Sequence, residues 1–362
     1  MASRKKKGQE KPLDQNLQVT LSKIVTTYGD GSIMRLGSRG HIEVPSIPTN
    51  ALALDIDLGI GGFPRGRMVE VYGPESSGKT TLCLTVVANA QKAGGVGCII
   101  DTEHALDPTW AATIGCNVDD LLISQPDCAE DALGIALDLV QSNQIAILVI
   151  DSVAALVPRA EIEGQIGDSH VGLQARLMSQ AMRKLNGAVC KSNTCLVFTN
   201  QIREKIGVMF GNPETTSGGN ALKFYASIRM RISKSETITA TGDEHPIGNV
   251  VKYNIVKNKM AAPFRKGTFD ILYDSGINPA YSLVDVAEEF GVVEKRGSWY
   301  AYGTEQLGQG KSAVVQLLLD DPDLMKKIDR EVRIAAGLIK EKLEEPKPEE
   351  PKPEGAPGDE SK

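Results

Sequence analysis

The amino-acid sequence predicts an α/β protein, with a mainly parallel β-sheet flanked by helices, a helix ahead of this core and a small α+β domain after it. From residue 66 onwards, short apolar runs alternate with amphipathic helical segments, and polar residues rarely interrupt those runs. Strands buried on both faces have this composition, and alternation of strands with helices is typical of parallel sheets. After residue 220 apolar and polar residues alternate, which predicts antiparallel strands that extend the same sheet.

The first element is an amphipathic helix over residues 13–28, because apolar side chains recur there at helical spacing until the turn at 29–31. Its apolar stripe must be covered either by the protein's own core or by a neighbouring subunit. The core elements follow as strand 68–72, helix 78–93, strand 96–101, helix 107–115, strand 121–124, helix 129–142, strand 145–151, helix 172–191 and strand 194–200. Later elements are expected as strands 224–232 and 249–256, helix 281–290, strand 298–302 and a helical stretch at 321–343.

These patterns divide the chain into four parts. Residues 1–40 carry a basic arm and the first helix, 41–274 form the core, 275–343 form the α+β domain, and 344–362 form an acidic tail. The tail is rich in Pro, Glu and Lys, a composition that predicts disorder. The formal net charge of −6 therefore does not exclude a polyanionic partner, because charge is unevenly distributed and a basic patch can form locally.

The cysteines and the hydropathy indicate a cytoplasmic protein. None of the six cysteines belongs to a CxxC pair, and several lie within apolar runs, which is typical of reduced core residues. No stretch approaches the roughly 20 consecutive apolar residues that a membrane span requires. We therefore expect no membrane partner.

Residues 73–80 read Gly-Pro-Glu-Ser-Ser-Gly-Lys-Thr and match the pattern GxxxxGK[ST] between a strand and a helix. The glycines allow backbone N–H groups to converge on phosphate oxygens, and the N-terminus of the helix favours negative charge. Lys79 would contact the β- and γ-phosphates, and the Thr80 hydroxyl would coordinate Mg²⁺. This segment predicts a P-loop NTPase core that binds ATP and Mg²⁺ through Gly73, Pro74, Glu75, Ser76, Ser77, Gly78, Lys79, Thr80 and Thr81.

Polar residues at the ends of later strands are candidates for the metal and the attacking water. Asp151 ends the apolar run 145–151 and is the favoured Mg²⁺ partner, with Asp101 as the alternative. Glu103 lies where a carboxylate could orient a water near the γ-phosphate, although it could equally cap the next helix or pair with His104. Gln201 follows strand 194–200, and its amide could sense the γ-phosphate.

Two glycine-punctuated segments, 163–171 and 201–219, resemble no ordinary loop. Long irregular segments inside a compact domain are usually functional or disordered. The second segment combines cations, apolar groups and a Gly-Gly pair in Arg203, Lys205, Ile206, Phe210, Gly218 and Gly219. Cations that follow a phosphate backbone and apolar groups that touch bases suit single-stranded nucleic acid. A flexible protein-binding loop or a lid is the alternative.

Six motifs, in this order, resemble the bacterial RecA family of homologous-recombination proteins over residues 13–340. They are GPESSGKTT at 73–81, DTEHALDP at 101–108, AALVPRAE at 154–161, the segments 164–172 and 200–220, and VKNKMAAPF at 256–264. The resemblance implies that ATP lies between adjacent protomers of a helical filament on single-stranded DNA. It also implies that Glu103 is the catalytic glutamate, that Gln201 is a γ-phosphate switch, and that Lys257 and Lys259 reach the phosphates across the subunit interface.

The resemblance assigns the remaining surfaces as well. Asp107 and Trp110 lie beside the nucleotide, Phe224 contacts the next subunit, and the helix at 13–28 packs on the neighbouring protomer. The region 275–343 corresponds to a C-terminal domain that gates duplex DNA, followed by a regulatory tail. Segments 163–171 and 202–219 correspond to two DNA-binding loops, whose expected contacts, with those of the adjoining helices, are Val171, Arg176, Arg203, Lys205, Ile206, Gly218, Gly219 and Asn220.

Three positions depart from the family pattern. Trp110 replaces a more frequent tyrosine, so that stacking on the adenine is kept. Val171 replaces a methionine, which shortens the apolar wedge of the first loop, and Glu204 places an acid beside Arg203. None of these changes removes a catalytic group.

The resulting expectation is a DNA-dependent ATPase that polymerises on single-stranded DNA, pairs it with homologous duplex and exchanges strands. Its expected partners are single-stranded and double-stranded DNA, further copies of the chain, and a LexA-like repressor whose self-cleavage it promotes. Two alternatives are a non-hydrolysing scaffold locked by ATP and a ring-shaped helicase motor with the same core. The presence of Glu103, Lys257 and Lys259 argues against the scaffold.

Overall fold

The computed structural model describes residues 14–35, 44–165, 167–170, 172–204, 213–239 and 245–339. The chain divides into two compact units, residues 1–44 and residues 45–362. Among the helices described, none combines the length and apolar character that a membrane crossing needs.

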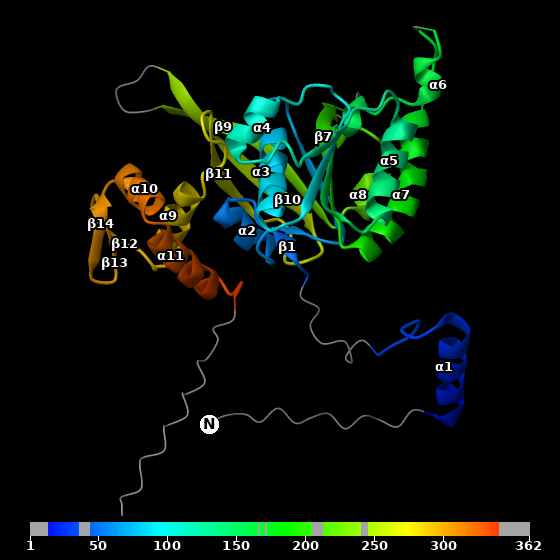
Figure 1. Cartoon of the computed structure of the whole chain (residues 1–362), viewed down its shortest axis with the longest axis horizontal. Helices are drawn as coiled ribbons and strands as arrows, with labels where there is room; N and C mark the ends of the chain where they lie inside the picture. The colour runs from blue at the N-terminus through cyan, green and yellow to red at the C-terminus, as the bar shows by residue number, and fades with distance from the viewer. Residues whose placement is uncertain are drawn as a thin grey trace, which may run out of the picture. The chain divides into compact units, whose positions relative to one another are not determined.

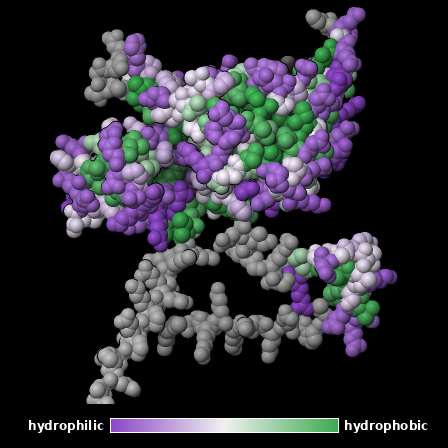
Figure 2. All heavy atoms as spheres, viewed as in Figure 1, coloured by the Kyte–Doolittle hydropathy of each residue, from purple (hydrophilic) through white to green (hydrophobic). Residues whose placement is uncertain are grey.

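The first unit contains helix α1 (Gln15–Tyr28). Asp14 caps this helix, because its carboxylate accepts a hydrogen bond from the N–H of Asn16 at 2.9 Å. No residue of α1 is buried, and Leu17 and Tyr28 are exposed apolar side chains of this helix. Figure 2 shows the hydrophobic surface of this unit in green. The helix therefore has the predicted position, and the described residues of this unit leave its apolar side chains exposed or only partly buried.

A large sheet forms the centre of the second unit (Figure 1). Its strands are β3 (Arg67–Gly73), β4 (Val96–Asp101), β5 (Leu122–Ser124), β6 (Ile145–Asp151), β7 (Cys195–Glu204), β8 (Glu214–Thr216), β9 (Ile228–Thr239), β10 (Pro246–Asn258) and β11 (Lys266–Leu272). They lie in the order β11-β10-β9-β3-β7-β6-β4-β5, and β8 pairs with β7. Neighbouring strands from β9 to β5 are parallel, whereas β10 and β11 add antiparallel. This order confirms the predicted mainly parallel sheet and its antiparallel extension.

Helices cover both faces of this sheet. One face packs against α3 (Lys79–Lys92) and α4 (Pro108–Ile114), and the other against α5 (Ala129–Gln141), α7 (Leu173–Ser192) and α8 (Ala221–Tyr225). Side chains alternate along β3, so that Val69 and Val71 join the core beneath α3 while Met68 joins the core beneath α7. Figure 1 shows α5 and α7 side by side on their face. The smaller elements are β1 (Ser46–Ile47), α2 (Leu52–Leu58), β2 (Phe63–Pro64), a 3₁₀ turn (Val153–Ala155) and α6 (Arg159–Ile162).

A small α+β domain follows the core. It contains α9 (Pro279–Glu289), the antiparallel strands β12 (Glu294–Arg296), β13 (Trp299–Tyr302) and β14 (Glu305–Gln309), and then α10 (Lys311–Asp320) and α11 (Pro322–Ala335). These elements share their own apolar core, which also takes in Leu52 of α2. Asn278 caps α9 by accepting a hydrogen bond from the N–H of Ala280 at 2.9 Å.

Three details of the sequence-based assignment were wrong. Phe224 does not begin a strand, because it lies in α8 and β9 begins only at Ile228; apolar residues at every second position from Phe224 had continued the strand pattern backwards. Residues 201–204 extend β7, and 214–216 form β8 against it, although both stretches were expected to be irregular. Helix α10 had not been expected. The segment 205–212, the residues 166 and 171, and the tail from residue 340 lie outside the described residues.

Candidate nucleotide-binding site

The P-loop joins the end of β3 to the start of α3, as the motif requires. Its glycines are fixed by close packing. A Cβ on Gly73 would lie 2.1 Å from the carbonyl oxygen of Ile232, and one on Gly78 would lie 2.4 Å from Cδ1 of Ile271. Gly78 also has a φ of +89°, which disfavours any larger side chain. The backbone can therefore follow this path only with glycine at both positions.

Lys79 lies across the P-loop. Its Nζ donates to the carbonyl oxygens of Gly73 at 3.3 Å and Pro74 at 2.7 Å. Burial lowers the pKa of Lys79, and the neighbouring carboxylates of Asp151 and Glu103 oppose this shift. The hydroxyl of Ser77 is buried in the same loop and makes no hydrogen bond within the described part of the chain. A half-buried cation and a buried hydroxyl without a partner, in a glycine-containing turn at the start of a helix, suit a phosphate group.

Thr80 and Asp151 meet at the carboxyl edge of the sheet. The Thr80 hydroxyl donates to Oδ2 of Asp151 at 2.7 Å, and the Thr199 hydroxyl donates to Oδ1. Burial raises the pKa of Asp151, while these two hydrogen bonds counteract the shift. A threonine hydroxyl beside a carboxylate is the donor set that holds Mg²⁺ in P-loop proteins. The residues present therefore fit this ion.

Asp101, the alternative metal partner, has a different surrounding. Its Oδ1 accepts backbone N–H groups from Glu103 and Ala105, and its Oδ2 accepts that of Leu106 and the side-chain amide of Gln125. These contacts organise the turn after β4. The geometry thus favours Asp151 for the metal and Asp101 for holding Glu103 in place.

The side chains of Glu103 and Gln201 point at each other. Nε2 of Gln201 donates to Oε1 of Glu103 at 3.2 Å, and the Ser152 hydroxyl donates to the same oxygen. Thus the carboxylate of Glu103 faces Gln201 of β7. The cap of α4 is instead Asp107, whose carboxylate accepts from the N–H of Thr109 at 2.8 Å.

One cavity of about 500 Å³, large enough for a nucleotide, is lined by Lys79, Thr80, Glu103, Asp151 and Gln201. The indole N–H of Trp110 donates to the Thr81 hydroxyl at 3.4 Å and lies at its wall. Five further wall residues come from β9, β10, β11 and the residue after β11, namely Lys234, Asn249, Val251, Ile271 and Tyr273. The sequence did not indicate them, because no motif connects these strands to the P-loop. The complete lining is Glu75, Ser76, Ser77, Gly78, Lys79, Thr80, Thr81, Glu103, Trp110, Asp151, Gln201, Lys234, Asn249, Val251, Ile271 and Tyr273.

Lys257 and Lys259 do not line this cavity within the described chain. Nζ of Lys257 donates to the carbonyl oxygens of Lys223 at 2.7 Å and Phe224 at 2.8 Å, at the C-terminal end of α8. Burial lowers the pKa of Lys257 to about 8, and the charges of Lys259 and Arg229 add to the shift. Phe224 itself is 74% exposed. These residues therefore belong to a surface of the protomer that is separate from its own P-loop.

Two polar segments flank the start of α7. Gln174 donates from Nε2 to the carbonyl oxygens of Val153 and Leu156, and its Oε1 accepts the N–H of Gly218 at 3.2 Å. Arg203 is exposed on β7, where it pairs with Thr215 of β8. The remaining described candidates lie nearby in sequence, with Arg176 in the first turn of α7, Gly219 next to Gly218 and Asn220 at the N-cap of α8. Val171, Lys205, Ile206 and Phe210 fall outside the described residues.

Comparisons with known proteins cover both domains of the chain. The model of the RecA N-terminal domain matches residues 15–278, and that of the RecA C-terminal domain matches residues 281–337. The chain is 58% identical to the protein RecA of Leptospira meyeri, over 90% of this chain and 85% of the relative. It is 55% identical to the protein RecA of Amycolatopsis mediterranei, over 90% and 93%, and 56% identical to that of Syntrophus aciditrophicus, over 91% and 95%. With a P-loop, a strand-end carboxylate and both domains matched along nearly its whole length, the chain belongs to the RecA family.

Proposed function

We propose that this protein is an ATP-driven recombinase that forms filaments on single-stranded DNA, pairs the bound strand with homologous duplex and exchanges strands. RecA-family proteins are DNA-dependent ATPases of recombination and repair, and this chain has the family's two domains. The observation that carries the proposal for this chain is the meeting of Lys79, the Thr80–Asp151 pair and the Glu103–Gln201 pair around a single cavity.

Each of these groups has a role in the hydrolysis of ATP. Lys79 and the P-loop amides would hold the phosphates. Thr80 and Asp151 would hold Mg²⁺, which would supply positive charge to neutralise the phosphates. Glu103 orients the attacking water and accepts its proton. Gln201 contacts Glu103, so its amide can respond to the γ-phosphate. Asp107 and Trp110 flank the adenine, with the indole as the stacking surface.

The second half of the ATP site comes from a neighbouring protomer in this proposal. Lys257 and Lys259 lie on the surface beside α8 rather than at their own P-loop. A cation supplied across an interface can stabilise charge that develops on the transferred phosphate, as an arginine finger does. The exposed Phe224 and the uncovered apolar side chains of α1 would complete the contact between protomers.

DNA would bind at the segments 163–171 and 201–219. Arg176, Arg203, Lys205 and Asn220 would contact phosphates and polar base edges, Gly218 and Gly219 would bring backbone close to the strand, and Val171 and Ile206 would touch bases. We further propose that 275–343 admits duplex DNA, that the acidic tail 344–362 restrains it, and that the filament promotes self-cleavage of a LexA-like repressor in the cytoplasm.

Electron microscopy of the full chain with single-stranded DNA, Mg²⁺ and a slowly hydrolysed ATP analogue tests the proposal. We expect open helical filaments with the analogue and none with ADP. Closed rings that unwind forked duplexes would identify a helicase motor. Filaments that form with ATP but release no phosphate when DNA is added would identify an ATP-locked scaffold.

A further inference from the structure

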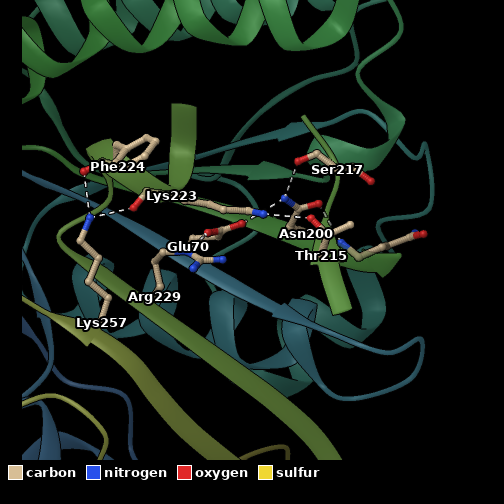
Figure 3. A network of polar contacts seen from close by, with 9 residues as sticks. Glu70, Asn200, Thr215, Ser217, Lys223, Phe224, Arg229 and Lys257 are labelled. Carbon is tan, nitrogen blue, oxygen red and sulfur yellow. Dashed lines mark hydrogen bonds and ion pairs between the residues drawn. The ribbon is translucent and has the colours of Figure 1, made fainter. Parts of the chain in front are cut away.

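A charged side chain interrupts the apolar face of β3 three residues before the P-loop. Glu70 is fully buried, and its neighbours on this face, Met68 and Phe198, belong to the apolar core beneath α7. A buried carboxylate is costly unless it is paired and hydrogen-bonded. Figure 3 shows both partners: Oε2 accepts from Nε of Arg229 at 2.5 Å, and Oε1 accepts from Nδ2 of Asn200 at 3.1 Å.

The carboxylate fixes the orientation of the Asn200 amide. An ionised carboxylate only accepts hydrogen bonds, so Asn200 must turn its NH₂ group towards Glu70. In that orientation Nδ2 also donates to the carbonyl oxygen of Ser217 at 3.1 Å, and Oδ1 accepts the backbone N–H of Gln201 at 2.9 Å. The side-chain amide of Asn200 thus connects the two ends of the segment 201–217, and Glu70 fixes the orientation of this amide.

Both ends of this connection lead to functional groups. Gln201 donates to Glu103 and lines the nucleotide cavity. Ser217 precedes Gly218, whose N–H donates to Gln174 at the start of α7. The connection therefore runs from the nucleotide cavity to the base of the proposed second DNA loop, through a buried network that stands apart from both sites.

Arg229 ties the same network to the strand that carries the P-loop and to the subunit surface. Its guanidinium lies 5.0 Å from the ring centroid of Tyr72 on β3. It comes from β9, where it is the register partner of Glu70. In Figure 3 the Glu70–Arg229 pair lies between Asn200 and Lys257. Arg229 thus pairs with Glu70 and holds its carboxylate in place.

We propose that Glu70 is a positioning residue that couples nucleotide to DNA. Glu70 holds Asn200 in one orientation, in which Asn200 contacts both Gln201 and Ser217. A movement of Gln201 at the γ-phosphate is therefore transmitted to Ser217, and from there to the second loop. This inference rests on the proposed function and deepens it, because it assigns part of the coupling to a buried residue that acts only through Asn200.

Glu70→Gln in the full chain tests this role. The variant keeps the shape of the side chain, but a glutamine amide can donate a hydrogen bond as well as accept one. It therefore no longer selects a single orientation of the Asn200 amide. The readout is the ratio of ATP turnover with saturating oligo-dT to turnover without DNA, because general destabilisation lowers both rates together. We expect this ratio to fall about tenfold, the effect of one hydrogen bond to a charged group.

Asp55→Asn is the matched control. Asp55 is also a fully buried carboxylate, but it accepts its hydrogen bonds from Thr49, away from this network. We expect the control to keep the wild-type ratio. An equal fall of the ratio in Asp55→Asn would show that the fall does not depend on the contact between Glu70 and Asn200, and would overturn the inference.

A wild-type ratio in Glu70→Gln overturns the inference and leaves the proposed function intact. Wild-type protein whose turnover does not respond to DNA overturns the proposed function as well. If Glu70→Gln fails to fold because Arg229 is left unpaired, the double variant Glu70→Met/Arg229→Met removes both charges from the core. It lacks the acceptor for Asn200, so the same fall is expected, and an unchanged ratio there decides against the inference.

Discussion

At the scale of single residues, the site depends on the half-buried amine of Lys79. Burial lowers the pKa of Lys79, and the carboxylates of Asp151 and Glu103 oppose this shift. Lys79→Ala removes this charge, so we expect nucleotide affinity to fall by at least about 100-fold and turnover to be lost. Titration with a fluorescent ATP analogue measures this. Lys92→Ala, at the far end of the same helix, is the control and should bind normally; normal binding by Lys79→Ala would remove the phosphate assignment.

Glu103 offers a cleaner separation of binding from chemistry. Glu103→Gln keeps the oxygen that Ser152 and Gln201 contact, but the amide cannot take a proton from water. We therefore expect a loss of roughly 10²- to 10⁴-fold in kcat, with nucleotide affinity close to that of the wild type. Single-turnover phosphate release, together with the same fluorescence titration, measures both. Turnover at the wild-type rate would exclude Glu103 from the mechanism.

Asp55 should make the stability of the fold depend on pH. Its carboxylate accepts from Thr49, Oδ2 has no partner among the described residues, and burial raises its pKa to about 7, with Arg333 opposing and Asp329 adding to the shift. Because the pKa of the folded state lies above the ordinary value of 3.8, the folded state binds more protons between these pH values. The free energy of unfolding should then fall as the pH rises from about 4 to about 7.

Asp55→Asn removes this titration, so the comparison between the two proteins isolates it. Between pH 5 and pH 8 we expect the wild type to lose about 2 kcal/mol more than the variant. Urea unfolding at the two pH values, followed by circular dichroism, measures the difference. Parallel stability profiles of the two proteins would show that the buried carboxyl group does not titrate in this range.

At the scale of elements, helix α1 has no buried residue in its own unit. A stripe of apolar side chains in this position needs a partner, and the proposed partner is a second copy of the chain. Leu17→Asp places a charge on the stripe, whereas Ser22→Asp places one on another face of the same helix. We expect Leu17→Asp to abolish sedimentation of DNA-bound filaments while the core domain keeps its melting temperature, and Ser22→Asp to assemble normally. Equal assembly of the two variants would contradict this role of α1.

The elements also show where sequence reasoning succeeds. Strand β6 has the predicted bounds, because an unbroken apolar run that ends in an acidic residue defines both ends of the strand. Helix α8 was missed, because its five residues are too short for a helical period and continue a strand-like alternation. Strand β8 was missed because it is made by pairing with β7 across a segment without periodicity.

The same distinction applies to the site. The P-loop residues and Asp151 could be predicted, since each follows a recognisable strand. Lys234 and Tyr273 could not, because they reach the cavity from strands that lie far along the chain. Nothing in the sequence singled out Glu70 within strand 68–72, and only its contact with Arg229, 159 residues away, makes it a member of a network.

At the scale of the whole molecule, the chain carries net negative charge but is proposed to bind a polyanion. Cationic side chains near the binding site must then contact the DNA phosphates, and these contacts should weaken as the salt concentration rises. We expect the logarithm of the affinity for oligo-dT with ATP to fall linearly with that of the salt concentration, and Arg203→Ala to reduce the slope by about 0.7. Fluorescence anisotropy at several salt concentrations measures this. Lys184→Ala on α7 is the control, and an unchanged slope in Arg203→Ala would remove this contact.

The register of the sheet sets a rule for how this protein can change. Gly73 and Gln201 are partners on neighbouring parallel strands, as are Asp101 and Asp151. Gln201 and Asp151 are therefore aligned with their neighbours by the register of the sheet rather than by the conformation of a loop. Gaining or losing one residue within a strand would turn the side chains beyond it to the opposite side. Exchanges of one amino acid for another should thus be tolerated at many strand positions where a single-codon insertion or deletion would silence the ATPase.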